Sequence, residues 1–306
     1  MSTVTVPPTT AGARAASPAV VTATLADRWL ALGLFGLAAG LASVSLLGPF
    51  LTETIHYHVS TTLLNQTIGL DAVSLVVVAP LAVAIGVLAL RGRPAAPVLA
   101  LGPATYTAYM FLQYVVGPEY LSRPGNSERF FPLFVVLFAL GSAVAVRAWS
   151  TIELARLPAL SERRLHLVGG VLLPLGALVA FSRYVPALAD AMSASPADGG
   201  YLAGPTFFWT IAMLDLGLAL PAVVVACIGL LRGAAWGVKA AYGVVGWLAL
   251  VGTAVAGMGI AMYANDDPNA SLGATVAMTL LAVAFVALAL LVYGPLVRTG
   301  VRRERA

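Results

Sequence analysis

The sequence is poor in charged residues. Only 10% of its 306 residues are Asp, Glu, Lys or Arg, whereas 60% are hydrophobic and the mean hydropathy is +0.92. Soluble domains carry about 25% charged residues, so this composition excludes an ordinary soluble protein and predicts an integral membrane protein.

Cysteine and the common catalytic motifs are also missing or scarce. The single cysteine, Cys227, lies in an apolar run, which excludes a disulfide framework. The sequence contains no Walker loop, no H-E-x-x-H and no G-x-S-x-G motif. ATP-driven transport by this chain alone is therefore excluded. We expect no cofactor, and the absence of these motifs favours a protein that is not an enzyme without excluding one.

Long apolar runs dominate what the sequence does contain. A helix needs about 20 apolar residues to cross roughly 30 Å of hydrocarbon. Eight segments satisfy this: 29–51, 61–90, 97–117, 130–148, 165–187, 206–231, 236–262 and 271–295. We therefore expect an all-α integral membrane protein with eight transmembrane helices, joined by loops too short to fold as a soluble domain.

The positions of the basic residues predict the orientation. If the N-terminus is cytoplasmic, only Arg123, Arg129 and Arg183 of the 17 basic residues fall on the opposite side. Cytoplasmic loops carry an excess of Lys and Arg, so we expect both termini to lie in the cytoplasm. The membrane that the chain spans is expected to be a bacterial plasma (inner) membrane. The net charge of +4 thus reflects topology and a bilayer partner, and does not indicate nucleic-acid binding.

The expected domain layout has three parts. Residues 1–26 are rich in Pro, Thr and Ala and are predicted to form a disordered cytoplasmic tail. Residues 27–296 form the transmembrane domain, and residues 297–306 form a basic cytoplasmic tail that can contact anionic lipid.

Two stretches of the chain resemble each other. Residues 66–92 and 210–233 both contain Thr-Ile, Leu-Asp, a proline, Ile-Gly and Arg-Gly, in that order. Asp71 then corresponds to Asp215 at an offset of 144 residues, while Arg91 and Arg232 differ by 141. We expect two four-helix repeats, about 27–150 and 163–296, which run parallel because four is an even number of spans.

The repeat explains two aspartates inside apolar segments. Asp215 lies ten residues after Pro205, so it is roughly 15 Å into its helix. If the repeats are equivalent, the helix of Asp71 begins near Thr61 and Asp71 is buried as well. A carboxylate in hydrocarbon costs at least about 2.5–3.5 kcal/mol, so both residues should face the bundle interior.

We expect these carboxyls to form one polar centre. Thr105, Tyr109 and Gln113 recur every four residues and share a helix face. The predicted centre comprises Asp71, Asp215, Tyr106, Tyr109, Gln113 and Trp247. Two roles stay open: protonated pins that hold helices together, or a site for a proton, an ion or a solute. Pro80 and Pro221 should kink the two helices.

Other polar residues are candidates on the outer side. His56 and His58 are candidates for a metal pair, although positions two apart do not face each other on a helix. Arg183 and Glu53 are candidates for lining an outer vestibule. Eight aromatic residues fall near predicted interfaces and are expected to form membrane belts: Trp29, Tyr114, Tyr120, Phe130, Trp149, Tyr201, Trp209 and Tyr263.

The motif Gly69-Leu70-Asp71-Ala72-Val73-Ser74-Leu75, Tyr106 with Tyr109, Phe131 through Leu140 and Met213 through Ala222 together resemble an uncharacterised family of bacterial, actinobacterial-type multi-pass membrane proteins. The resemblance implies architecture and no known activity. A histidine three positions before the second aspartate is typical of that family, and the chain has Ala212 there.

Three functions fit these observations. The first is a small secondary transporter or a proton- or ion-coupled permease that uses the paired aspartates on a proton or a small solute. The second is a non-catalytic accessory subunit that binds a protein partner or forms a homo-oligomer, with structural aspartates. The third is an intramembrane enzyme that acts on a lipid or a quinone.

Overall fold

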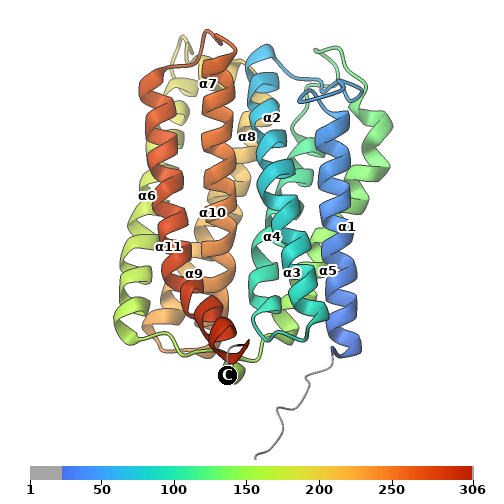
Figure 1. Ribbon diagram of the computed structural model, residues 1–306. Coiled ribbons are helices and arrows are strands. Elements are labelled where there is room, and N and C mark those ends of the chain that lie inside the picture. Colours follow the sequence, from blue (N-terminus) through green and yellow to red (C-terminus); the bar gives the residue numbers. More distant parts are fainter. Residues whose placement is uncertain (1–22, 305–306) are drawn as a thin grey trace, which may run out of the picture.

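A computed structural model describes residues 23–304, and most of the predicted N-terminal tail therefore lies outside the described residues. Helices make up 79% of the structure, and residues 23–304 contain no strand. Figure 1 shows long helices packed side by side in one bundle. We call the end at which α1 begins and α11 ends the lower end, and the opposite end the upper end (Figure 1).

The helices follow the predicted segments closely. The first half contains α1 (Leu25–Leu47), α2 (Thr61–Val73), the π-helical η1 (Ser74–Val78), α3 (Ala79–Leu90), α4 (Ala96–Val116), the 3₁₀ turn η2 (Ser127–Phe130) and α5 (Phe131–Thr151). After the short η3 (Leu154–Arg156), the second half contains α6 (Glu162–Ala191), α7 (Gly199–Leu202), α8 (Pro205–Leu214), the π-helical η4 (Asp215–Ala219), α9 (Leu220–Leu231), α10 (Ala235–Ala264) and α11 (Leu272–Glu304).

Seven helical stretches within the described residues are long and apolar enough to cross a membrane: Leu25–Leu47, Thr61–Leu90, Ser127–Thr151, Glu162–Ala191, Pro205–Leu231, Ala235–Ala264 and Leu272–Leu296. The chain therefore has the architecture of a helical membrane protein.

The remaining predicted span corresponds to α4, which is a helix but is less apolar. It has 21 residues, of which 15 are buried, and it packs against α3, α5, α8 and α10. A helix surrounded by other helices can carry tyrosines, threonines and a glutamine, because these face protein groups and not lipid. This location explains its composition.

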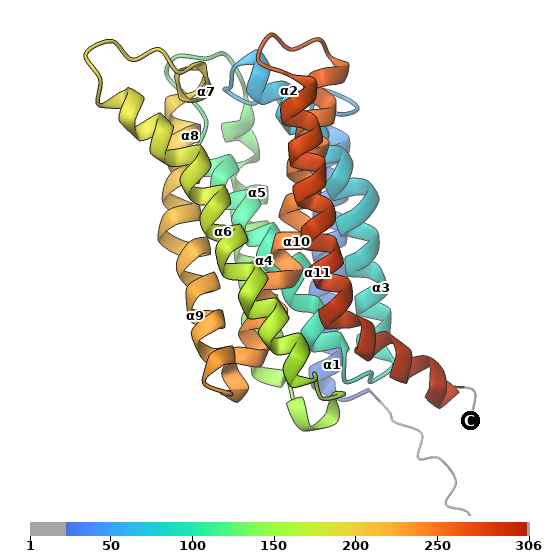
Figure 2. The same cartoon turned by 90° about the vertical axis from the view of Figure 1, so that its left-hand side faces the viewer.

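Local sequence determines where several helices begin and end. Thr24 and Asp27 form a capping box that starts α1, with Asp27 N–H donating to Thr24 Oγ1 at 3.2 Å. α2 begins at Thr61, as the repeat predicted, after the N-cap Ser60. One expected limit was wrong: α1 ends at Leu47 and not at residue 51. The candidate span Leu272–Leu296 agrees with the predicted segment 271–295, and α11 continues beyond it as a helix to Glu304. Figure 2 shows α11 bending near its lower end, and Pro295 lies within this helix.

The two helices that carry the aspartates each contain a widened π turn. The N–H of Ala79 bonds to the carbonyl of Ser74, and the N–H of Leu220 to that of Asp215, both five residues back. Pro80 and Pro221 follow directly. A proline ring clashes with the carbonyl four residues earlier in a regular α-helix, and a wider turn relieves that clash. The expected kinks therefore take the form of π turns.

These local features are separated by a constant 141 residues. The spacing relates the first residues of the π turns, Ser74 and Asp215, and also Pro80 and Pro221. It further relates Gly92 and Gly233, which end the two helices with a φ of 62° each. By this spacing Asp71 corresponds to Ala212, so the two aspartates stand one helical turn apart and not at equivalent positions.

Glycines allow the central helices to approach closely. A Cβ at Gly69 on α2 would lie 2.2 Å from the carbonyl oxygen of Gly257 on α10. A Cβ at Gly102 on α4 would lie 3.3 Å from the carbonyl carbon of Gly246 on α10. Contacts between small residues are typical of membrane helix interfaces, and they bring α10 of the second half against α2 and α4 of the first half.

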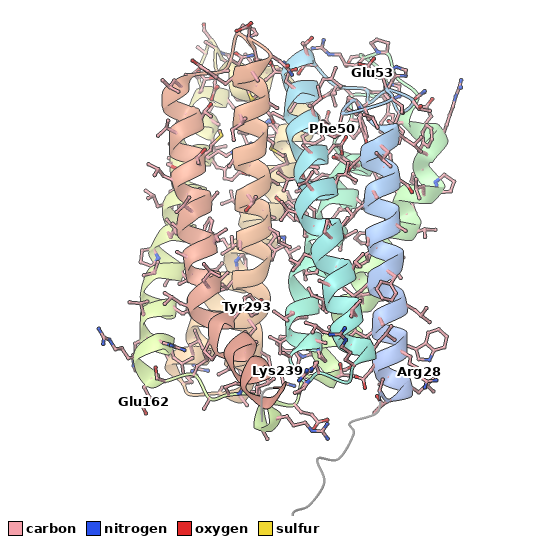
Figure 3. All side chains as sticks on the ribbon, viewed as in Figure 1. Arg28, Phe50, Glu53, Glu162, Lys239 and Tyr293 are labelled. Carbon is pink, nitrogen blue, oxygen red and sulfur yellow. The ribbon has the colours of Figure 1, made fainter. Side chains whose placement is uncertain are left out.

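The outer faces of the bundle are apolar and the charged residues lie near its ends. Trp29, Leu178 and Leu280 are each more than half exposed, as expected for side chains that face lipid. Figure 3 labels Arg28, Glu162 and Lys239 at the lower end and Glu53 at the upper end.

Candidate functional site

Asp71 is the most deeply buried carboxyl among the described residues. It lies in the last turn of α2 and is 1% exposed. Its Oδ2 has no hydrogen-bond partner among the described residues, and neither does the buried hydroxyl of Tyr114 on α4. The Tyr114 hydroxyl lies beside Asp71, but the two groups do not meet with normal hydrogen-bond geometry. Burying a polar group without a hydrogen-bond partner costs free energy. The burial of both groups therefore indicates a role that offsets this cost.

Ser74 and Tyr106 form a second polar pair next to Asp71. The Ser74 Oγ and the Tyr106 hydroxyl are 2.8 Å apart, and both residues are buried. Tyr106 is 0% exposed. This hydrogen bond joins the π turn η1 to α4 and places two more hydroxyl groups on the side of Asp71 that faces α4.

Asp215 has a different environment. Tyr109 on α4 donates a short hydrogen bond to its Oδ1, and Tyr184 on α6 donates to its Oδ2 at 2.5 Å. The guanidinium of Arg183 lies 5.5 Å from the centre of the Tyr184 ring. Both carboxyl oxygens thus have donors, and three helical elements meet at this one residue.

The predicted polar centre is therefore divided into two clusters. Tyr106 belongs to the cluster of Asp71, whereas Tyr109 belongs to that of Asp215. Trp247 on α10 contacts the Tyr109 ring edge-on, with 5.2 Å between ring centres. Gln113 is buried on α4, as expected of the shared helix face.

Two important tyrosines escaped the sequence analysis. Tyr184 was not singled out, because nothing in the sequence shows that α6 turns this residue toward α4. Tyr114 was assigned to an interfacial belt, and this was wrong: it is 3% exposed and its ring packs against Tyr57 at 5.0 Å. Tyr57, from the segment 48–60 that follows α1, covers one side of the Tyr114 ring, and Phe134 of α5 packs on it as well.

The structure does not bring the two vestibule candidates together. Arg183 lies on α6 and is exposed, with its guanidinium over the rings of Tyr184 and Phe208. Glu53 lies in the loop that follows α1 at the upper end (Figure 3). Because α6 and α1 stand on opposite sides of the bundle (Figure 1), the two residues cannot line one vestibule.

The two candidate histidines have separate protein partners. The ring nitrogens of His58 lie 2.7 Å from the carbonyl oxygen of Arg123 and 2.7 Å from Glu128 Oε2. Both neighbours are acceptors, so the doubly protonated ring satisfies both. Burial lowers the pKa of His58, but these hydrogen bonds outweigh it and the pKa is raised. His56 instead lies by Asn126, and residues 23–304 contain no cluster of three or more metal-ligating His, Cys, Asp or Glu side chains.

Asn126 joins the two loops that carry these histidines. Its Oδ1 accepts the N–H of His56 at 2.8 Å, and its side-chain amide donates to the carbonyl of Thr54 at 3.1 Å. The N–H of Glu119 also donates to the carbonyl of His58 at 2.7 Å. Loops 48–60 and 117–130 thus form one hydrogen-bonded layer, which we call the upper cap.

Comparisons with protein-family models, with curated proteins and with solved structures find no match for this chain.

Proposed function

We propose that the chain is a proton-coupled membrane protein, either a small secondary transporter or a proton- or ion-coupled permease, in which Asp71 carries the proton. The observation that carries this proposal is the buried Asp71 carboxyl, which is 1% exposed and has an Oδ2 without a hydrogen-bond partner among the described residues. Ionisable residues inside membrane spans commonly mark proton relays and ion pathways.

The chemistry of a carboxyl group supports this role. An ionised carboxylate can accept several hydrogen bonds and needs most of them when it is removed from water. Asp71 forms none of the ion pairs that the described residues make. A protonated carboxyl is neutral and needs fewer partners, so this position suits a group that gains and loses a proton during its work.

The proposal includes eight transmembrane helices in two parallel repeats, with α4 as the eighth span. Corresponding helices have similar neighbours: α4 packs on α5 and α10 on α11, while α1 packs on α3 and α6 on α9. The spacing of 141 residues between the two π turns supports the same relationship. Both termini are proposed to be cytoplasmic in a bacterial plasma membrane, since arginines are concentrated in the lower-end segments.

A second candidate function is a non-catalytic subunit, which the environment of Asp215 favours. Both oxygens of this carboxyl accept tyrosine hydroxyls, from α4 and from α6. Such an arrangement is typical of a structural pin between helices. If Asp71 has the same purpose, the chain binds a partner protein and moves no proton.

Proton flux into liposomes separates these two functions. The full chain is reconstituted with a pH-sensitive dye inside, and a potassium diffusion potential drives proton entry. Proton entry should be faster into liposomes that contain the wild-type protein than into empty liposomes. Asp71→Asn should reduce the rate to that of empty liposomes. Asp267→Asn is a matched control, because Asp267 is also buried but is hydrogen-bonded by Asn65 and Thr62 at the upper end. Wild-type flux equal to that of empty liposomes would favour the subunit function.

A further inference from the structure

A small cavity lies directly beside Asp71. Its volume is about 10 Å³, and its walls come from α1, α2, η1 and α4. Four of the lining residues are polar: Ser45, Asp71, Ser74 and Tyr114. A cavity of about 10–15 Å³ on this measure accepts one water molecule, provided that two to four polar groups face it. The cavity therefore has the size and the lining of a site for a single water.

The polar atoms of this cavity are incompletely paired. Asp71 Oδ2 and the Tyr114 hydroxyl have no partner among the described residues, and both side chains are more than nine-tenths buried. Ser74 already shares a hydrogen bond with Tyr106. Buried polar groups in native proteins nearly always have a protein or water partner. One molecule that both donates and accepts would satisfy Asp71 and Tyr114 together.

The site lies beneath the upper cap. α1 ends at Leu47, and a Cβ built at the next residue, Gly48, would lie 2.6 Å from Asp71 Oδ2. Asp71 therefore lies level with the upper end of α1. A residue larger than glycine at position 48 would collide with the Asp71 carboxyl. Tyr57 of the same loop packs on the ring of Tyr114, and its buried hydroxyl also has no partner among the described residues.

On the side of Asp71 toward the lower end, the neighbouring hydroxyls of Ser74 and Tyr106 are hydrogen-bonded to each other at 2.8 Å. The following turns of this helix bury Val78, Ala82 and Ile85, each at most 1% exposed. Unpaired hydroxyl groups therefore continue from Asp71 toward the upper cap, whereas toward the lower end the paired hydroxyls of Ser74 and Tyr106 are followed by packed hydrocarbon. A proton needs a chain of groups that both donate and accept, and the hydroxyls of Tyr114 and Tyr57 are groups of that kind.

We propose that Asp71 and Tyr114 bind one water molecule in this cavity, through which Asp71 exchanges its proton with the upper end of the molecule. The O–H bond of the Asp71 carboxyl breaks as its proton passes to the water oxygen, and the water passes one of its own protons to the Tyr114 hydroxyl. Tyr114 in turn gives its original proton to the Tyr57 hydroxyl, and Tyr57 passes its own proton to bulk water above the upper cap. Every oxygen then regains its starting number of protons except that of Asp71, which is left as a carboxylate. The inference rests on the proposed function and adds the route and the side of access.

Infrared spectroscopy of the reconstituted full-length protein tests the site. The C=O stretching band of protonated Asp71 is identified by its loss in Asp71→Asn, or by its shift in Asp71→Glu if the first variant does not fold. Tyr114→Phe should shift this band and slow its exchange in deuterated buffer by about tenfold, the effect of one hydrogen bond on a rate. Tyr109→Phe removes a hydroxyl from the same helix but faces Asp215, so it should leave the Asp71 band unchanged.

The side of access is tested by a second pair of variants. Asn126→Ala loosens the upper cap and should accelerate deuterium exchange of the Asp71 band. Tyr293→Phe removes a 2.6 Å hydrogen bond to the Tyr242 carbonyl near the lower end (Figure 3) and should not alter the exchange. The proposal is overturned if Tyr114→Phe leaves the band and its exchange unchanged, if Tyr293→Phe accelerates exchange and Asn126→Ala does not, or if the band responds to sodium at constant pH.

These results are independent of the flux assay. If the protein conducts no protons but Tyr114→Phe shifts the Asp71 band as expected, the water site stands and the proposed function is wrong. If proton flux depends on Asp71, but Tyr114→Phe and Asn126→Ala do not change the Asp71 band or its exchange, the proposed function stands and the proposed proton route is wrong.

Discussion

The Tyr184 hydroxyl donates a 2.5 Å hydrogen bond to Oδ2 of Asp215, which joins α6 to the π turn η4. α6 needs such an anchor, because most of its apolar surface is not buried against other helices. Figure 2 shows that it crosses the bundle obliquely. With few packing contacts of its own, this helix depends more than the others on a specific polar contact.

We therefore expect Tyr184→Phe to destabilise the protein. The change keeps the ring and removes one donor from a carboxyl, which should lower the free energy of unfolding by roughly 1–2 kcal/mol. Reversible unfolding in detergent micelles measures the loss. Tyr120→Phe is the control, since the Tyr120 hydroxyl lies at the upper end, donates to the Val115 carbonyl and contacts no carboxyl of the bundle interior. Equal losses in the two variants would show that Asp215 does not anchor α6.

The contact between α2 and α10 should be intolerant of any side chain at Gly69. An added Cβ would meet the backbone of Gly257 at 2.2 Å, and backbone cannot rotate away. We expect Gly69→Ala to lower the free energy of unfolding by about 1–3 kcal/mol, as overpacking does.

The matched variant for that contact is Gly170→Ala on α6. A Cβ at Gly170 meets nothing within 4 Å, so the change should be neutral or stabilise by up to about 1 kcal/mol through helix propensity. Thermal unfolding of both variants beside wild type provides the comparison. A Gly69→Ala protein as stable as Gly170→Ala would contradict the close approach of the two helices.

The upper cap should be more stable in mildly acidic than in alkaline solution. The pKa of His58 is raised in the folded protein, so its contribution is fully present below the unfolded value of about 6.5. That contribution is lost as the pH rises through the folded pKa. The groups that face His58 are the Glu128 carboxylate, the Arg123 carbonyl and the Tyr120 ring.

Thermal unfolding measured across this pH range tests the histidine. Wild type should lose stability as the pH rises above about 6.5, and His58→Gln should lose most of that dependence. His166→Gln should retain it, because His166 is exposed at the lower end and bonds to the Glu162 carbonyl of its own helix. A pH profile unchanged by His58→Gln would contradict the pairing with Glu128.

Much of the fold was predictable from the sequence, because a helix that crosses a membrane requires a run of about 20 apolar residues. The resemblance between residues 66–92 and 210–233 added what hydropathy could not: it predicted the start of α2 at Thr61, within a stretch that is not apolar. The end of α1 was missed because Leu47 through Leu51 is apolar. A Gly-Pro pair there ends the helix, although the hydrophobic run continues.

The site was less predictable because the rotation of each helix about its axis is a property of packing. Both aspartates and Tyr109 could be named from their intramembrane positions. The burial of Tyr114 could not, because it depends on the upper cap, and the partnership of Tyr184 depends on the tilt of α6. The two aspartates also lie one helical turn apart in the constant spacing of 141 residues. Pairing them by residue identity alone therefore concealed their different environments.

The central claim concerns Asp71, and proton flux combined with stability tests it most directly. Asp71→Asn and Asp215→Asn are reconstituted beside wild type, and unfolding is measured on the same preparations. We predict that Asp71→Asn keeps its free energy of unfolding within roughly 1 kcal/mol, because an unpaired carboxyl loses little when it becomes an amide, and that it abolishes proton flux. Asp215→Asn should lose stability instead, because two tyrosine hydroxyls lose a carboxylate acceptor. Wild-type proton flux in a folded Asp71→Asn protein would contradict the account.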